Sequence, residues 1–501
     1  MKNTLPLHPF LIAIYPVLFL YSENIRQLSV SVVLVPLVFF GVSALILLLI
    51  GKRFLGNSER AALCVSIFFV WLFSYSVVRS TIAFEIAGMQ LYRHMYFILI
   101  WTAVLLISLL LAVKVRLDYA KISKVLNIFA VLLILFPFLT ITSDRYNQST
   151  SPGSKAAPLR NGDISLSVRT DTLPDIYYII LDSYTGQKAL KQYLDFDNSS
   201  FVHFLRSKGF FVAEDSHSNY AWTGLSVAST LNMDYLPTTP KSRASDTLQV
   251  DGTVSEYDLI RNSRARDFLE SLGYKFVDLS IWSNQLFVTS NDYLYEYFTN
   301  DFNLSLLQMT ILDRPLVENY ILARVKRERI LRTFDDLRSV VDAQGPVFVY
   351  AHFLIPHHPY VFDRTGNMHP FYLPRTENGS EKNRYLEQLL YANKEMEKTI
   401  DVILTKSTRI PIIVVQGDHG ADQLGEGELV NARMRMSILN AYYLPDKGKK
   451  ALYETITPVN TFRVIFNTYF GANLPLLPDE AFFSKNEPNP KLINITPLLR
   501  Q

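Results

Sequence analysis

Three places in this 501-residue sequence put carboxylate and imidazole side chains after apolar runs that are typical of buried strands. The residues are Asp182, His357, and the adjacent pair Asp418 and His419. Because functional groups of a parallel sheet gather at the carboxyl ends of its strands, we expect these side chains to lie near one another. Carboxylate oxygen and imidazole nitrogen suit a divalent ion such as Zn²⁺ or Mn²⁺. Taken singly, each residue could instead be a turn residue, a cap or a packing group.

A fourth candidate is Thr223, in the stretch NYAWTGLSVASTLN, where a loop is expected to become a helix. A hydroxyl at a helix N-terminus lies among unpaired N–H groups and at the positive end of the helix dipole. A neighbouring divalent cation would lower the pKa of this hydroxyl and activate it as a nucleophile. The alternative is that Thr223 only caps the helix.

Strands alternate with longer helices in the second part of the chain, which predicts an α/β fold with a mostly parallel sheet covered by helices on both faces. The predicted strands are 176–181, 210–212, 275–279, 346–352 and 410–415, and the predicted helices are 199–208, 315–342, 382–406 and 459–469.

Five stretches near the N-terminus contain no Asp, Glu, Lys or Arg: 3–22, 29–51, 61–78, 95–113 and 125–143. Each has roughly the 17–25 residues that a helix needs to cross about 30 Å of hydrocarbon. They predict five transmembrane helices, with buried helices of a soluble protein as the alternative. The Ser-, Asn- and Gly-rich stretch 144–172 reads as a linker, so the predicted domains are 1–143, the linker 144–172, and one domain over 173–501.

Basic residues in the loops predict the orientation of these helices. Eight lie on one side, namely Lys2, Lys52, Arg53, Arg60, Lys114, Arg116, Lys121 and Lys124. Three lie on the other side, namely Arg26, Arg79 and Arg93. The N-terminus is therefore expected in the cytoplasm. With five spans, the domain after residue 143 is expected outside it.

Composition excludes several classes of protein and site. The balance of 49 Lys and Arg against 46 Asp and Glu argues against a nucleic-acid binder that neutralises phosphates broadly. The single cysteine, Cys64, lies in the third apolar stretch, so the large domain has neither disulfides nor thiolate metal ligands. Five residues are candidates for lining a pocket, with packing as an equal alternative: Tyr220, Trp222, Asn232, Asn460 and Arg463.

Together, the motifs resemble those of the alkaline phosphatase superfamily, sulfatase branch. They are Asp182 at a strand end, Thr223 in Thr-x-x-Ser, His357 in His-x-Pro-Tyr, and Asp418 and His419 before a glycine. Within the branch, the chain resembles membrane-anchored phosphotransferases, namely lipoteichoic acid synthases and lipid A phosphoethanolamine transferases. These carry about five transmembrane helices before an extracytoplasmic catalytic domain.

The resemblance implies a role for each matching residue. Asp182, Asp418 and His419 would hold one divalent metal ion, and Thr223 would complete the coordination and attack phosphorus to form a phospho-threonine. His357 would contact the substrate or its leaving group, a role that we do not extend to the neighbouring histidine. The implied enzyme sits in a bacterial inner membrane. It would take a phospho-alcohol head group from a membrane phospholipid and pass it to an envelope lipid or glycan.

Departures from the family patterns keep two alternatives open. The first ligand is Asp182, as in sulfatases, where the phosphotransferases usually have Glu. The stretch that begins at Thr223 lacks the Cys- or Ser-x-Pro-Ser-Arg motif of sulfatases, and the domain lacks the disulfides of phosphoethanolamine transferases. One alternative is a sulfatase-like hydrolase of sulfate esters. The other is a catalytically silent sensor or assembly protein with the same fold.

Overall fold

The computed structural model describes most of the chain, and its contacts divide the chain into two compact units. One unit comprises residues 1–153 with 288–323, and the other comprises 154–287 with 324–501. The described residues are 5–25, 28, 30–85, 91–150, 173–236, 247–249, 256–280, 301–312, 321–368, 378–422, 424–445, 448–484 and 491–499.

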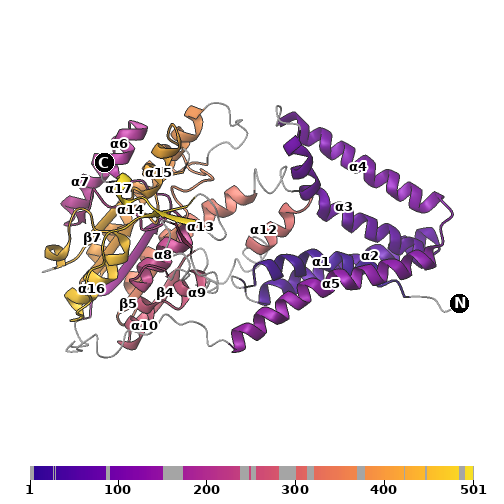
Figure 1. Cartoon of the computed structure of the whole chain (residues 1–501), viewed down its shortest axis with the longest axis horizontal. Helices are drawn as coiled ribbons and strands as arrows, with labels where there is room; N and C mark the ends of the chain where they lie inside the picture. The colour runs from indigo at the N-terminus through magenta and orange to yellow at the C-terminus, as the bar shows by residue number, and fades with distance from the viewer. Residues whose placement is uncertain are drawn as a thin grey trace. The chain divides into compact units, whose positions relative to one another are not determined.

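The first unit is helical, and most of its surface-facing residues are apolar. Its N-terminal helices are α1 (His8–Glu23), α2 (Ser31–Leu55), α3 (Ser58–Glu85), α4 (Leu91–Lys114) and α5 (Tyr119–Thr150) (Figure 1). Among the described residues, four helices are long and apolar enough to cross a membrane, within α2, α3, α4 and α5. Four of the five predicted spans therefore form helices with the length and composition that a membrane span requires. Helix α5 also continues to Thr150, past the predicted domain boundary at residue 143.

Helix α1 forms where the first span is predicted, but it is shorter than a typical span. Its 16 residues rise about 24 Å, less than the thickness of the hydrocarbon layer. Buried polar contacts fix its N-terminal end to two other helices. The His8 ring lies 2.6 Å from Ser66 Oγ of α3 and 3.2 Å from Ser123 Oγ of α5. Asn127 Oδ1 of α5 accepts a hydrogen bond from the His8 backbone N–H at 2.8 Å.

A short segment from later in the sequence also belongs to this unit. Helix α12 (Asp301–Gln308) buries Phe302 and Leu306 in a cluster with Val17 and Tyr21 of α1. Contacts group residues 288–323 with the helical unit, whereas the sequence predicts one domain over 173–501. Sequence periodicity gives no sign of this, because the contact joins residues far apart in the chain.

The second unit is built on a six-stranded sheet with the order β2-β7-β6-β1-β5-β4. The strands are β1 (Asp175–Leu181), β2 (Phe211–Val212), β4 (Lys275–Leu279), β5 (Val347–Phe353), β6 (Pro411–Gln416) and β7 (Asn440–Tyr443). Strands β6, β1, β5 and β4 pair in parallel, and β7 runs antiparallel to both of its neighbours. The predicted strands and the mostly parallel sheet are confirmed, while β7 was not predicted.

Helices surround this sheet (Figure 1). They are α6 (Gln187–Leu194), α7 (Ser199–Ser207), α8 (Thr223–Asn232), α9 (Glu256–Arg261), α10 (Arg264–Ser271), α13 (Leu322–Ser339), α14 (Asn378–Lys406), α15 (Glu428–Met436), α16 (Thr461–Tyr469) and α17 (Thr496–Leu499). The predicted helices correspond to α7, α8, α13, α14 and α16, although residues 315–320 lie outside the described residues. A second sheet, β3-β9-β8, joins β3 (Thr247–Gln249), β9 (Lys491–Asn494) and β8 (Phe482–Phe483) and was not predicted.

Every residue of β1 is buried, which requires cover on both faces of the sheet. On one face, Tyr178 packs edge-on against Phe462 of α16 with ring centroids 5.3 Å apart. On the other face, Phe353 of β5 packs against Phe334 of α13 with centroids 4.2 Å apart. Alternate residues of each strand therefore enter two separate apolar layers, and the strand ends are left to carry polar groups.

This burial predicts a strong position dependence for truncations of isoleucine. We expect Ile179→Ala, at a fully buried position in the centre of β1, to lower the free energy of unfolding by about 2–5 kcal/mol because it leaves a cavity. Ile410→Ala, at a position that is 60% exposed, should change it by less than about 0.5 kcal/mol. Chemical denaturation of the purified chain measures both, and equal effects would contradict the described packing.

Candidate metal centre

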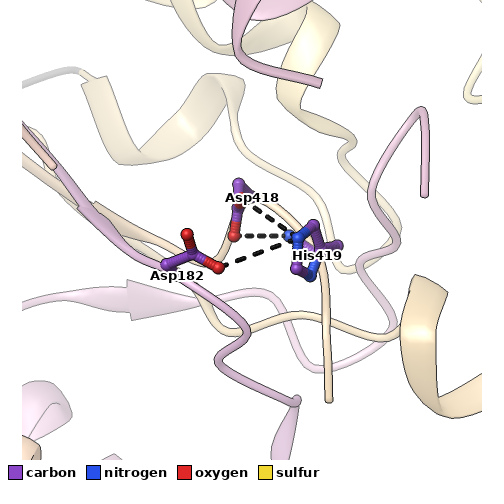
Figure 2. A group of neighbouring side chains, drawn as sticks. All are labelled: Asp182, Asp418 and His419. Atoms are coloured by element: carbon purple, nitrogen blue, oxygen red, sulfur yellow. Dashed lines mark hydrogen bonds and ion pairs between the residues drawn. The ribbon is translucent and has the colours of Figure 1, made fainter. Parts of the chain in front are cut away.

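The parallel pairing of β1 with β6 brings the predicted carboxylates together. Ile180 of β1 lies opposite Gln416 of β6, so the two strands end at the same edge of the sheet. Asp182 follows β1, Asp418 and His419 follow β6, and all three are buried. One ligand atom from each of the three lies within 4.8 Å of the others. Figure 2 shows the two carboxylates and the imidazole pointing toward one another.

Backbone turns after the strands fix the carboxylates. Ser183 adopts a left-handed conformation with φ of 64°, and its N–H donates to Asp418 Oδ1 at 3.1 Å. The Ser183 hydroxyl donates to Asp182 Oδ1 at 3.2 Å. Gly420 follows His419 because a Cβ at that position would lie 2.0 Å from the carbonyl oxygen of Met434. The hydrogen bonds of Ser183 and the tight packing at Gly420 therefore fix the positions of the acidic side chains.

The orientation of the His419 ring leaves one nitrogen available to the cluster. Nδ1 donates to the carbonyl of Gly420 at 3.0 Å, since a carbonyl oxygen can only accept. Nε2 then carries the lone pair, and it lies 3.3 Å from Asp418 Oδ2 and 3.7 Å from Asp182 Oδ1. A ring fixed through Nδ1 with Nε2 facing two carboxylates is the usual arrangement of a metal-binding histidine.

One buried oxygen supports the fit of a cation to this cluster. Asp418 Oδ2 is buried and makes no hydrogen bond of ordinary geometry in the described structure, although His419 Nε2 lies 3.3 Å away and the Thr223 hydroxyl is near enough to lower the pKa of Asp418. A buried carboxylate oxygen without a partner costs free energy, and a divalent ion would supply the missing contact. Two carboxylates and one imidazole also form a suitable donor set for zinc or manganese. These residues could therefore hold a metal ion.

Thr223 lies at the start of α8, in contact with His419. Trp222 is the N-cap residue of α8, and no side chain caps the helix. The Thr223 hydroxyl instead donates to His419 Nε2 at 3.1 Å. The capping alternative is therefore wrong for this residue, and its hydroxyl joins the cluster of candidate ligands.

His357 lies outside the three-residue cluster but within its electrostatic range. It follows β5 in a loop, and its Nδ1 hydrogen-bonds to the carbonyl of His358. Its own carbonyl accepts hydrogen bonds from Lys326 Nζ at 2.6 Å and from Gln388 Nε2 at 3.0 Å. The charge of His357 is one of the causes that lower the pKa of Asp182.

Two further residues of the site were not predicted from the sequence. His352 is fully buried in β5, and its Nε2 lies 3.4 Å from Asp182 Oδ2 while Nδ1 contacts the Tyr350 hydroxyl at 3.1 Å. The other is Lys326 of α13, which is also buried. The signal for His352 was available, because a histidine inside an otherwise apolar strand next to β1 needs a polar partner. Nothing in the helical pattern of α13 distinguishes Lys326 from its basic neighbours.

The candidate pocket residues mostly serve the core. Four of them form side-chain hydrogen bonds to backbone atoms. The Tyr220 hydroxyl accepts from Leu236 N–H, and the carbonyls of Leu259, Leu477 and Met233 accept from Asn232, Asn460 and Arg463, in that order. Trp222 alone adjoins Thr223 in sequence, and its Nε1 donates to Ser484 O at 3.1 Å.

Burial and neighbouring charges set the protonation of the cluster. Burial, with the charge of Asp182, raises the pKa of Asp418 to about 6. Burial also raises the pKa of Asp182, but His357, His352 and His419 outweigh it, so that the net pKa lies below the usual range. Burial, with the charge of Arg435, lowers the pKa of His419 to about 3, so its ring is neutral at physiological pH. Burial lowers the pKa of Lys326 to about 7, although the negative charge of Asp182 acts in the opposite direction and raises it.

The sequence matches the protein-family model Sulfatase over residues 188–464, which is more than half of the chain. The chain belongs to the sulfatase family. The matched region of this family member includes Thr223, His357, Asp418 and His419, and Asp182 precedes it. The resemblance to the alkaline phosphatase superfamily is thus confirmed at the level of the sulfatase family.

Several solved structures are similar to this family member. The C-terminal periplasmic domain of EcEptC from Escherichia coli, in complex with Zn, is 13% identical, covering 69% of this chain and 99% of that chain with a TM-score of 0.44. The lipooligosaccharide phosphoethanolamine transferase EptA from Neisseria meningitidis is 12% identical, covering 91% and 92% with a TM-score of 0.38. The putative sulfatase yidJ from Bacteroides fragilis is 12% identical, covering 64% and 83% with a TM-score of 0.37. No protein with a curated description matches the chain.

The pKa values predict how metal affinity depends on pH. Asp418 must lose its proton to bind a cation, whereas Asp182 and His419 are already unprotonated near neutral pH. We expect the zinc affinity of the purified chain to rise about tenfold per pH unit up to about pH 6 and then to level off. Competition with a chelator from pH 5 to 8 measures this. Asp418→Asn should bind zinc weakly and without this pH dependence, and a flat profile for the native chain would contradict the assignment.

Proposed function

We propose that this chain is a metal-dependent phosphotransferase, which moves a phospho-alcohol head group to an envelope lipid or glycan through a phosphate ester on Thr223. The observation that carries the proposal is the contact of the Thr223 hydroxyl with His419 Nε2, beside two buried carboxylates. A hydroxyl at a helix start, next to a cation site, is the arrangement that activates a threonine as a nucleophile.

In this proposal, Asp182, Asp418 and His419 hold one zinc or manganese ion, and Thr223 completes its coordination. When bound, the ion would lower the pKa of the Thr223 hydroxyl and offset negative charge on the phosphoryl oxygens. Ser183 keeps Asp418 in place through its backbone N–H. The unpaired N–H groups of the first turn of α8 favour the negative charge of a phosphoryl group on Thr223.

The reaction would proceed in two transfers at phosphorus. Thr223 Oγ1, having lost its proton in the loaded site, first forms a bond to phosphorus while the bond to the departing alcohol oxygen breaks, and the protonated ring of His357 gives its Nε2 proton to that oxygen. An acceptor hydroxyl then attacks the phospho-threonine, loses its proton to His357, and releases Thr223. His357 is suited to this exchange because Nδ1 is occupied by the His358 carbonyl, so Nε2 is the nitrogen left for the substrate.

The apolar helices support a donor and an acceptor at a membrane surface. Four helices suffice to assign the side of the second unit, because the connections α2–α3 and α4–α5 carry most of the basic residues. The segment after α5 then lies on the opposite side, whether or not α1 crosses the bilayer. We therefore place the catalytic unit outside the cytoplasm of a bacterial inner membrane, where membrane phospholipid is the donor.

Hydrolysis of sulfate esters is the second candidate. Membership of the sulfatase family and an aspartate at position 182 favour it. Against it stands the stretch from Thr223 to Val227, which offers a threonine in place of the Cys or Ser that sulfatases convert to formylglycine. A catalytically silent protein is less well supported, because all three candidate ligands are present and close together.

The central test is the covalent adduct. The purified chain incubated with phospholipid and zinc should carry a phosphate ester on the peptide that contains Thr223, as detected by mass spectrometry. Thr223→Ala should abolish the adduct and reduce phosphodiester turnover by about a thousandfold or more, because the nucleophile is gone. Thr223→Ser should retain both in part. Full turnover by the alanine variant would refute the proposal, and faster turnover of an aryl sulfate than of a phosphodiester would favour the sulfatase.

The proposed orientation makes a separate prediction. In a Cys64→Ser background, a membrane-impermeant maleimide added to spheroplasts should label His203→Cys, at an exposed position in α7. It should not label Arg116→Cys, an exposed position between α4 and α5, until the membrane is permeabilised. Labelling of position 116 in intact spheroplasts would reverse the orientation.

A further inference from the structure

Within the described part of the chain, a buried lysine beside the site has no carboxylate partner. Lys326 of α13 is 7% exposed, and its Nζ donates to the carbonyl of His357 at 2.6 Å. Among the described residues, this carbonyl is its one hydrogen-bond partner, and no acidic oxygen lies within ion-pair distance. An ammonium group has three donors, so two remain for other acceptors. A buried charge with a single neutral partner is costly and needs an explanation.

Holding the His357 loop does not by itself require this charge. Gln388 of α14 already donates to the His357 carbonyl at 3.0 Å and to the Pro356 carbonyl at 3.1 Å. Its Oε1 accepts from the backbone N–H of Val361 at 2.6 Å. A neutral amide therefore fixes both sides of the loop, and removing the lysine would leave the His357 carbonyl hydrogen-bonded.

The charge balance of the site gives Lys326 a use. Lys326 Nζ contacts the loop that follows β5, the strand beside β1, and the charge of Asp182 raises the pKa of Lys326, so the ammonium is coupled to the metal centre. A divalent ion would offset the charges of Asp182 and Asp418, and His419 is neutral. The ammonium of Lys326 would then leave the loaded site with a surplus positive charge next to His357. An anion entering a poorly solvated site would supply the missing partner.

We propose that Lys326 is a positioning residue of this site, buried at a cost in stability, whose ammonium form makes the loaded site favourable for a phosphate anion. The inference rests on the proposed function, because it names the residue that favours the anionic substrate. It also explains why α13 places a lysine where an apolar residue would pack at lower cost.

The test compares variants of the full chain in detergent, loaded with one equivalent of zinc and desalted. Lys326→Met keeps the length of the side chain and removes its charge. We expect it to bind zinc within threefold of the native chain, to lose at least tenfold in affinity for inorganic phosphate by calorimetry, and to unfold at the same or a higher temperature. A merely structural lysine would give a lower unfolding temperature and unchanged phosphate affinity.

Two matched variants separate charge from loop position. Arg324→Met removes an exposed positive charge from the same helix and should leave phosphate affinity within threefold. Gln388→Met removes the neutral clamp and keeps the ammonium, so it should lower the unfolding temperature but weaken phosphate binding less than Lys326→Met. Lys326→Arg, which keeps the charge, should recover part of the affinity.

Three results would overturn the inference: phosphate affinity within threefold in Lys326→Met, failure of that variant to fold, or equal losses in Lys326→Met and Gln388→Met. An absence of measurable phosphate binding to the native chain would do the same. None of these readouts needs turnover. A native chain that binds phosphate through Lys326 but forms no adduct on Thr223 would refute the proposed function and leave the inference standing.

Discussion

The parallel pairing of β1 with β6 is the interaction on which the site depends. It aligns the ends of two fully buried strands, so that Asp182 and Asp418 leave the sheet at the same edge and in the same interior space. Two carboxylates in such a place repel each other and lose hydration. The backbone N–H of Ser183, turned toward Asp418 by the left-handed conformation of that residue, reduces this cost, as does the imidazole of His419. The buried Asp418 Oδ2 remains as a candidate ligand for a cation.

Other elements of the second unit hold the residues of the site in position, some by direct contact with the cluster and others through the His357 loop. His352 fixes Asp182 from β5, and Thr223 reaches His419 from the first turn of α8. Lys326 and Gln388 hold the His357 loop from two further helices. Each contact joins residues separated by many positions in the chain, so the sheet must form before the site can exist.

The sequence predicts features that depend on local pattern, and it misses those that depend on distant pairing. Asp182, Asp418 and His419 could be predicted because apolar runs mark buried strands, and the ends of parallel strands meet. Strand β7 and the second sheet were missed because their strands are too short for a pattern to stand out. The burial of Lys326 and the contacts of α12 could not be predicted. The basic sequence of α13 does not show which of its residues is buried, and the apolar sequence of α12 does not show which helices it packs against.

The grouping of α12 with the N-terminal helices changes how the two units are joined. The chain passes from the helical unit to the sheet unit, returns to bury Phe302 and Leu306 against α1, and then passes back to α13. The units are thus connected covalently three times, and no single cut in the region 144–172 separates them cleanly. A fragment that begins at residue 173 would keep α12 but lack α1. Phe302 and Leu306 would then be exposed, and such an apolar patch favours aggregation or detergent binding.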